Sequence, residues 1–442
     1  MRLFGFIVLA GHLVFASLAA EAMAQRVITI DEALQLTLDY SRDVLIAGEG
    51  KKQSEGRYVE ERAAALPQLK LDASAVRLKD NVSSAPGKGL TYNGYNANLN
   101  LTQALFTWGQ IGAAIKAAKH DREATEQQYR EARQLAVREA ATAYYDLLLT
   151  LELAKVASDN VAQKQRHLDE ATRRHQAEVA TDYDVLSARV ALTNAQPALT
   201  RAENDIKLAT DRLRYYMGIE EDFEVKGPLQ CSLKAPFPLP EVLQRAQENR
   251  PEVAFYESRV GVFKELIKVA KGNARPRLDF KANAGRSAIG DLNSDVPGNY
   301  WDAGVYLSFP IFDGLKTKGQ VIQAKSRLAT TEYEMKRLLD QIALEARSAI
   351  NGVDEAIQII KGLEATITQT ERLLAMAETG YSAGVKTKLE VDDAETDVLT
   401  AKVNLARARR DYLRAWTLLS WIMGENLQEA VGSAEWTGCR LP

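Results

Sequence analysis

The segment 379–387 has the sequence TGYSAGVKT, and it matches the segment 173–181, RRHQAEVAT, at an offset of 206 residues (381 − 175 = 206). This register pairs His175 with Tyr381 and continues well beyond the two segments. Further pairs are Met217-Gly218 with Met423-Gly424 and Phe106 with Phe312 at 206, and Pro67 with Pro276 at 209 after one short insertion or deletion. Since chance does not keep one register over so long a stretch, the pattern indicates a chain built as one unit written twice.

Both copies predict the same order of elements, in which one pair of strands lies between helices. Copy one gives helix 31–65 with Asp31 as N-cap, a stop at Pro67, strands 68–78 and 95–105, helix 107–175, a break near 178–181, and helix 182–217 closed by Gly218. Copy two gives helix 239–274, strands 276–285 and 300–310, helix 313–379, the tip 380–387 and helix 388–423. A proline-free helix as long as 107–175 would span about 100 Å, which is typical of a coiled coil.

The segments around the two copies complete the expected domain organisation. Residues 1–24 have a positive start, an apolar run and the small-x-small sequence Ala22-Met23-Ala24, which predicts a cleaved signal peptide; a retained anchor is the alternative. The expected parts are repeat 1 at 25–218, an equatorial linker at 219–238, repeat 2 at 239–424 and a C-terminal equatorial segment at 425–442. Because no later run of 18 apolar residues exists, any integral membrane contact must come from strands.

The expected strands alternate strictly between apolar and polar side chains. In strand 68–78, Leu69 and Leu71 alternate with Lys70 and Asp72, and the other three strands follow the same pattern. About ten residues of this alternation per strand is the pattern of a transmembrane β-barrel with water inside, although a soluble sheet with one wet face shares it. Since a small barrel needs about eight strands, we expect several copies to complete it, with twelve strands in a trimer.

Composition excludes several classes of function. The net charge of −3, from 56 Lys+Arg and 59 Asp+Glu, leaves no basic excess for nucleic acid. Four scattered histidines and two cysteines argue against a metal site, and no phosphate-binding glycine pattern or nucleophile–base signature suggests an enzyme or a cofactor. In an exported protein Cys231 and Cys439 could form a disulfide or remain two separate buried thiols, and both readings stay open.

The duplicated order of elements, the signal peptide and the tip sequences resemble the TolC-type outer-membrane factor family. The resemblance covers residues 26–424 and rests on 381–387, YSAGVKT, followed by Glu390-Val391-Asp392-Asp393. It implies a homotrimer in which a twelve-stranded outer-membrane β-barrel is continued by a long α-helical coiled-coil tunnel through the periplasm. It also implies docking to a periplasmic adaptor and an inner-membrane pump of RND, ABC or MFS type, with outward transport of drugs, metals or proteins.

Candidate functional residues gather at the two tips. Glu390 and Asp393 are three apart at the start of a helix and share a face, so threefold symmetry would give a ring of acids that favours cations. The resemblance implies that these positions form the periplasmic constriction, whereas acids that only complement the helix dipole are the simpler alternative. It also implies that Lys386 and Tyr381 tether the tip closed through an acid of the other repeat, and Asp184 is the register mate of Glu390 (390 − 206 = 184).

Adaptor docking is expected at both tips. The residues concerned are Glu178, Val179 and Thr181 in repeat 1 and Gly384, Val385 and Thr387 in repeat 2. Because Glu178 stands where repeat 2 has Gly384, the two docking faces should not be equivalent. A soluble periplasmic coiled-coil adaptor or structural rod is the alternative function; it explains the helices but not the four alternating strands.

Overall fold

The computed structural model describes residues 26–80, 90–225, 227, 229, 233–289 and 297–428. The predicted signal peptide, Cys231 and Cys439 lie outside the described residues. The chain divides into two compact units. The sheet unit comprises 46–131 and 251–341, and the helical unit comprises the remaining segments, with 132–250 and 342–442 as its main parts.

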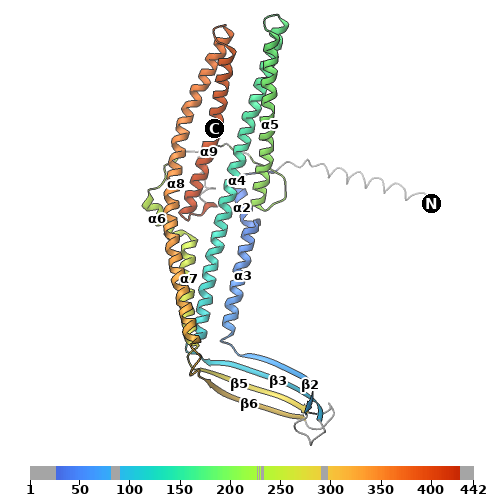
Figure 1. Cartoon of the computed structure of the whole chain (residues 1–442), viewed down its shortest axis with the longest axis vertical. Helices are drawn as coiled ribbons and strands as arrows, with labels where there is room; N and C mark the ends of the chain where they lie inside the picture. Colours follow the sequence, from blue (N-terminus) through green and yellow to red (C-terminus); the bar gives the residue numbers. More distant parts are fainter. Residues whose placement is uncertain are drawn as a thin grey trace, which may run out of the picture. The chain divides into compact units, whose positions relative to one another are not determined.

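Four antiparallel strands in the order β2-β3-β5-β6 form the sheet unit's main feature (Figure 1). Their bounds are β2 Gln68–Asp80, β3 Leu90–Phe106, β5 Arg277–Ile289 and β6 Pro297–Ser308. Three strands are longer than the predicted 68–78, 95–105 and 276–285. Strand β6 was predicted to reach residue 310, which was wrong: Pro310 has no N–H to donate to the ladder.

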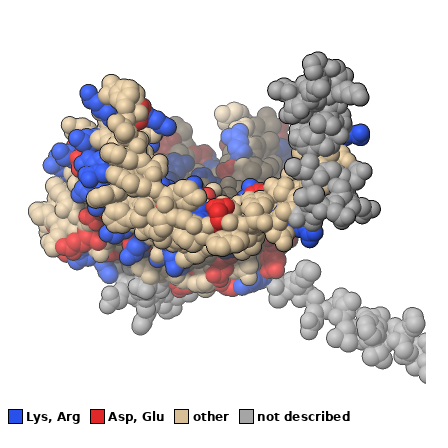
Figure 2. Space-filling view, turned by 90° about the horizontal axis from the view of Figure 1, so that it is seen from below, with Lys and Arg blue, Asp and Glu red and all other residues tan. Residues whose placement is uncertain are grey.

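The register places apolar side chains of all four strands on one face. Leu71, Leu99, Ala284 and Trp301 lie directly across from one another in successive strands. Leu71 is 69% exposed and Trp301 is 80% exposed, so this face is uncovered in a single chain. Over the strands, the surface in Figure 2 is mostly tan with few charged side chains.

The opposite face of the sheet is polar. Asn100 donates to Asp72 at 2.8 Å, and Asn283 donates to Asp302 at 3.0 Å. Tyr300 also lies on this face, because it pairs with Gly285 and its hydroxyl donates to Asn96 at 3.2 Å. A Cβ on Gly285 would come within 2.8 Å of the Tyr300 ring, so the glycine leaves room for the tyrosine to cross the strand.

Some of the described helices extend through both compact units, and the others lie within one unit. They are α2 Ile30–Tyr40, α3 Arg42–Ala63, α4 Gln110–Gln176, α5 Asp182–Met217, α6 Leu239–Asn249, α7 Pro251–Gly272, α8 Lys316–Ser382 and α9 Lys388–Ile422. In the helical unit a short parallel ladder joins β1 Arg26–Ile28 to β4 Phe223–Val225. Among the described helices, none is long and apolar enough to span a membrane.

Buried side chains of α4, α5, α8 and α9 form the core of the helical unit. Leu213, Met217, Leu419, Ile422 and Met423 are all fully buried in it. Helices α5 and α9 begin at the two tips, 177–181 and 383–387, and these buried residues lie at their opposite, C-terminal ends. The tips are the turns through which α4 runs back into α5 and α8 into α9 (Figure 1).

The predicted single helices 31–65 and 239–274 are each broken into two. Helix α2 ends at Tyr40, and α6 ends at Asn249. At the second break Pro251 follows Arg250, whose extended backbone (φ −66°, ψ 125°) is what a residue before proline adopts. The first helix also begins earlier than expected, since Thr29 and not Asp31 is its N-cap.

Each break lies against a glycine that follows a later helix, Gly218 after α5 and Gly424 after α9. Gly218 has φ +69°, and a Cβ there would lie 2.3 Å from the Tyr40 carbonyl oxygen. Gly424 also has φ +69°, and its Cβ would lie 2.7 Å from the Arg250 nitrogen and the Asn249 carbonyl carbon. Only glycine fits both the left-handed backbone and this close approach.

We expect Gly218→Ala and Gly424→Ala each to lower the free energy of unfolding by about 2 kcal/mol or more, because a left-handed alanine is strained and its Cβ meets backbone. Denaturant midpoints of the purified protein would measure this. Gly362→Ala is the matched control, since a Cβ at this helical site meets nothing within 4 Å and should raise stability by up to about 1 kcal/mol. Equal stability of the three variants would refute the close-approach argument.

Candidate functional site

The two tips are built on one local plan. A left-handed residue reverses the chain in each, Glu178 (φ 60°) in the first and Gly384 (φ 72°) in the second. A threonine then caps the returning helix: Thr181 is the N-cap of α5, and Thr387 is the N-cap of α9. A non-glycine residue is strained in the left-handed region of backbone conformation. The first tip therefore carries a strain energy at Glu178 that the second tip, with Gly384, avoids.

Two of the predicted tip acids, Asp184 and Glu390, belong to capping boxes. Asp184 accepts the Thr181 backbone N–H at 2.8 Å while its own N–H donates to the Thr181 hydroxyl at 3.3 Å. Glu390 and Thr387 exchange the corresponding bonds at 2.8 and 3.3 Å. The spacing T-x-x-D/E is the sequence signal of this motif. A capping role for Glu390 is compatible with both readings of the pair Glu390 and Asp393, which a single chain does not test.

Lys386 of the second tip donates to Glu390 in the first turn of α9 at 2.5 Å. The Lys386 ammonium, together with the Thr387 N–H, lowers the pKa of Glu390 to about 2. Crowding of acids from several copies would act in the opposite direction and raise the pKa, and a single chain does not test this. The predicted pair of Lys386 with Asp184 does not form within the described chain, and it stays a prediction for contacts between copies.

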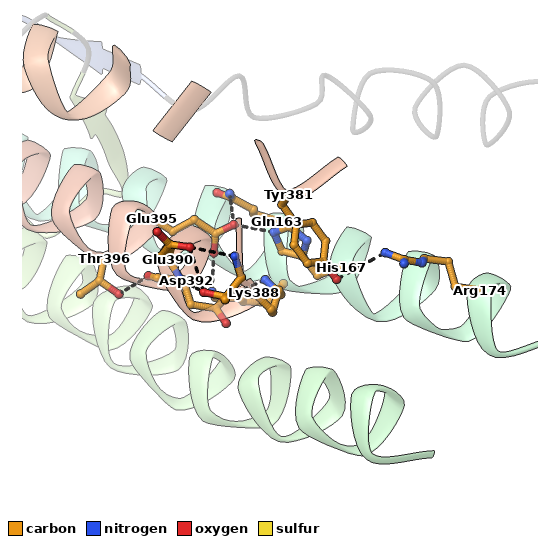
Figure 3. A network of polar contacts seen from close by, with 11 residues as sticks. Gln163, His167, Arg174, Tyr381, Lys388, Glu390, Asp392, Glu395 and Thr396 are labelled. Atoms are coloured by element: carbon orange, nitrogen blue, oxygen red, sulfur yellow. Dashed lines mark hydrogen bonds and ion pairs between the residues drawn. The ribbon is translucent and has the colours of Figure 1, made fainter. Parts of the chain in front are cut away.

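Helices α4 and α5 with the tip between them form the first hairpin, and α8 and α9 form the second. Tyr381 of the second hairpin contacts the first hairpin through an arginine that was not predicted from the sequence. Arg174 of α4 donates to the Tyr381 hydroxyl at 3.3 Å, and its guanidinium lies 5.7 Å from the centre of the ring (Figure 3). The hydrogen bonds from Thr181, supported by the charge of Arg174, lower the pKa of Asp184. Asp184 and Tyr381 thus share Arg174 as a neighbour, which brings two of the three predicted latch residues to one place.

A second polar connection lies further from the tips, around the buried Glu395 of α9 (Figure 3). Its carboxylate meets Lys164, His167 and Gln163 of α4. Burial by itself would raise the pKa of Glu395, but the bonds from His167 and Lys164 outweigh it and lower the pKa to about 2. Sequence analysis missed this residue, although an acid within the apolar stripe Val391, Ala394 and Val398 was a usable signal.

The remaining predicted tip residues are exposed. Val179 is 65% exposed and Val385 is 80% exposed, while Asp393 lies on the surface without burial. Between the tips a groove of about 400 Å³ is lined by apolar and charged side chains, including Arg174, Tyr183, Tyr381, Lys388 and Asp392. Such a surface suits contact with another protein, and nothing in one chain tests that prediction. Among the described residues no group of three or more His, Cys, Asp or Glu side chains could hold a metal ion.

Known proteins resemble this chain along most of its length. A family model described as outer membrane efflux protein matches residues 33–219 and 242–425. The outer membrane protein TolC of Escherichia coli (strain K12) is 26% identical over 372 residues, which are 80% of this chain and 73% of that protein. The alkaline protease secretion protein AprF of Pseudomonas aeruginosa is 24% identical over 373 residues, covering 82% of this chain and 77% of its own.

A solved structure also has this fold. The structure of a membrane protein from Pseudomonas aeruginosa matches with a TM-score of 0.78 at 20% sequence identity, covering 89% of this chain and 93% of that one. At this identity the likeness speaks for the fold alone. It covers helices and strands together, and so extends to both units of the chain.

We expect acidification to loosen the second tip. A carboxylate with a lowered pKa stabilises the folded tip fully above its ordinary value of 4.5, and this contribution is lost as the pH falls towards about 2. Hydrogen exchange of the Thr387 amide, corrected for its intrinsic rate, should therefore quicken between these values. Glu390→Gln is the control, because its amide cannot titrate; an equally steep response in that variant would contradict the assignment.

Proposed function

Because the chain belongs to the outer membrane efflux protein family, we propose that three copies of it form the channel-tunnel of a tripartite efflux or type I secretion system. The chain is an outer-membrane protein of a Gram-negative bacterium and extends into the periplasm. In the proposed assembly the strands form a barrel in the outer membrane, and the helices continue it as a tunnel. Pumped substrates then cross periplasm and outer membrane along one closed path.

The observation that carries the proposal is the sheet with two open edges. In the described sheet β2 pairs with β3 alone and β6 pairs with β5 alone. Neighbouring strands alternate in direction, so β6 runs opposite to β2 and can accept the β2 of another copy as a further antiparallel strand. Within lipid an unpaired edge would cost several kcal/mol per backbone group, so twelve strands from three copies close the barrel.

The two faces of the sheet fit such a barrel. Exposed apolar side chains such as Leu71 and Trp301 would face lipid. The polar face would line the lumen, where Lys70 pairs with Asp72 at 2.6 Å and Arg277 with Asp279 at 2.9 Å. These four charges neutralise one another in pairs, and the further charges Lys281 and Asp302 of the same face have opposite signs. We therefore assign selection by charge to the tips and not to the barrel.

We infer that the chain arose by duplication, with repeats at 25–218 and 239–424 joined by 219–238 and followed by 425–442. In support, α4 and α8 each have 67 residues, and both tips carry capping boxes. Left-handed residues also recur at the turn from strand to long helix, at Trp108-Gly109 and at Gly314-Leu315, again 206 apart (314 − 108 = 206).

The partners of this assembly would be a periplasmic adaptor at the tips and an inner-membrane pump beyond it. The exposed side chains Val179, Tyr183, Val385 and Leu389 give both tips apolar surface for an adaptor. Glu178 and Gly384 make the two tips chemically different at the same turn position. Each copy therefore offers two unequal docking faces.

The alternative, a soluble periplasmic adaptor or rod, leaves the exposed apolar face of the sheet unexplained. Purification separates the two functions: we expect a trimer that requires detergent and forms ion-conducting channels in planar bilayers. A monomer soluble in plain buffer, with no bilayer conductance, would establish the rod. Chemical cross-linking in detergent supplies the copy number independently of conductance.

The same bilayer recordings test the proposed gate of Glu390, Asp393 and the latch lysine Lys386. Replacing both acids, by Glu390→Gln with Asp393→Asn, should lower the cation-to-anion permeability ratio at least about twofold, since a ring of acids favours cations. Lys386→Ala should raise conductance by loosening the second tip. Glu203→Gln, which removes an exposed acid of α5, is the control; an equal effect there would refute the ring.

A further inference from the structure

We propose that Glu395 is a positioning residue of the gate: by binding three side chains of α4 it ties the second hairpin to the first within one copy and limits how far the tips can separate. The inference rests on the proposed channel function. It adds a tie that lies outside the tip residues Glu390, Asp393, Lys386, Tyr381 and Asp184.

The geometry uses both oxygens of the carboxylate. One oxygen (Oε1) accepts from Gln163 Nε2 at 2.7 Å and contacts His167 Nε2 at 2.5 Å, and the other (Oε2) accepts from Lys164 Nζ at 2.5 Å. The Glu395 side chain is only 5% exposed. A carboxylate in such surroundings is costly unless its hydrogen bonds are made, so α9 is held where α4 supplies them.

A second carboxylate supports the lysine of this tie. Asp392 lies 3.4 Å from Lys164 Nζ and also pairs with Lys388, one helical turn earlier in α9, at 2.7 Å. Lys164 is therefore placed between two acids of the same helix, and its side chain is 15% exposed.

The packing around the tie explains why a polar contact matters here. Near the tips, the apolar cluster of Ala377, Val391 and Ala394, with Leu374 and Tyr381 against it, joins α8 to α9 within one hairpin. The larger core that includes both hairpins contains α9 residues from Leu405 onward. Between these two clusters Glu395 connects α9 to α4 by polar contacts, and polar contacts can be released without exposing a large apolar surface.

The contact of Arg174 with Tyr381 is the weaker link between hairpins. Its distance is 3.3 Å and both groups are partly exposed, so water can replace it. Breaking one partner of the buried Glu395 set leaves a charge that water does not reach. We therefore assign control of the separation of the hairpins to Glu395 and a smaller contribution to Arg174.

The test begins with two single variants, Glu395→Gln on α9 and Lys164→Met on α4, which each remove one partner of the ion pair. Each should raise single-channel conductance at least about twofold, as the tips move apart. Hydrogen exchange of residues 391–398 should quicken about tenfold or more, because a broken buried pair favours local opening. Glu371→Gln is the matched control: it also removes a Glu–Lys pair, with Lys402 at 3.3 Å, but that pair is exposed and lies within one hairpin.

Combining the two substitutions separates one shared contact from two independent effects. The double variant Lys164→Met with Glu395→Gln should show about the same conductance and exchange as the more affected single variant, because both substitutions remove the same contact. Channels of unaltered conductance in both single variants, or a double variant whose effect on exchange equals the sum of the two single effects, would overturn the inference. If the unaltered protein forms no channels, the proposed function fails, while hydrogen exchange still decides whether Glu395 ties the hairpins.

Discussion

Unpaired backbone groups at the two edges of the sheet are the constraint on which the proposed assembly depends. Strands β2 and β6 each have a partner on one side only in the described sheet, and their free N–H and C=O groups need another strand or water. Because side chains alternate strictly, one face of the sheet is apolar, and residues such as Leu71 and Trp301 are exposed on it. Contact of this face with water is unfavourable. Pairing with further copies satisfies backbone and side chains at once.

Packing in the helical unit is divided between two kinds of contact. Large apolar side chains such as Leu213, Met217, Leu419 and Ile422 are fully buried together, and close backbone contact at Gly218 and Gly424 fixes the ends of the returning helices against the breaks in the first helices. Towards the tips, hydrogen bonds and ion pairs link the hairpins. Apolar burial resists separation over a wide range of conditions, whereas polar ties respond to charge and to single substitutions. Polar contacts therefore suit the tips, which open in the proposed channel, better than apolar burial does.

Sequence reasoning found the order of elements and the alternation of the strands because both follow from local rules: side-chain periods of 3.6 and 2 residues and the positions of proline and glycine. The break at Arg250 was not predicted although Pro251 was a local signal for it. The break at Ser41 was not predicted because nothing in a helical composition shows that a glycine more than 170 residues away approaches the backbone (218 − 41 = 177). Among the candidate site residues, the capping roles of Asp184 and Glu390 were readable from T-x-x-D/E. The gate and docking roles of the tip residues depend on other copies and partners and remain predictions.

The sequence by itself determined the order of long helices and alternating strands, because both features follow from the spacing of neighbouring residues. Only the tertiary structure decided which distant side chains meet: Glu395 with Lys164 and His167, Arg174 with Tyr381, and Tyr300 over Gly285. The reason is physical. A period fixes the face on which a side chain lies, but the partner on that face depends on how far one helix or strand is shifted along another, and packing of the whole unit sets that shift.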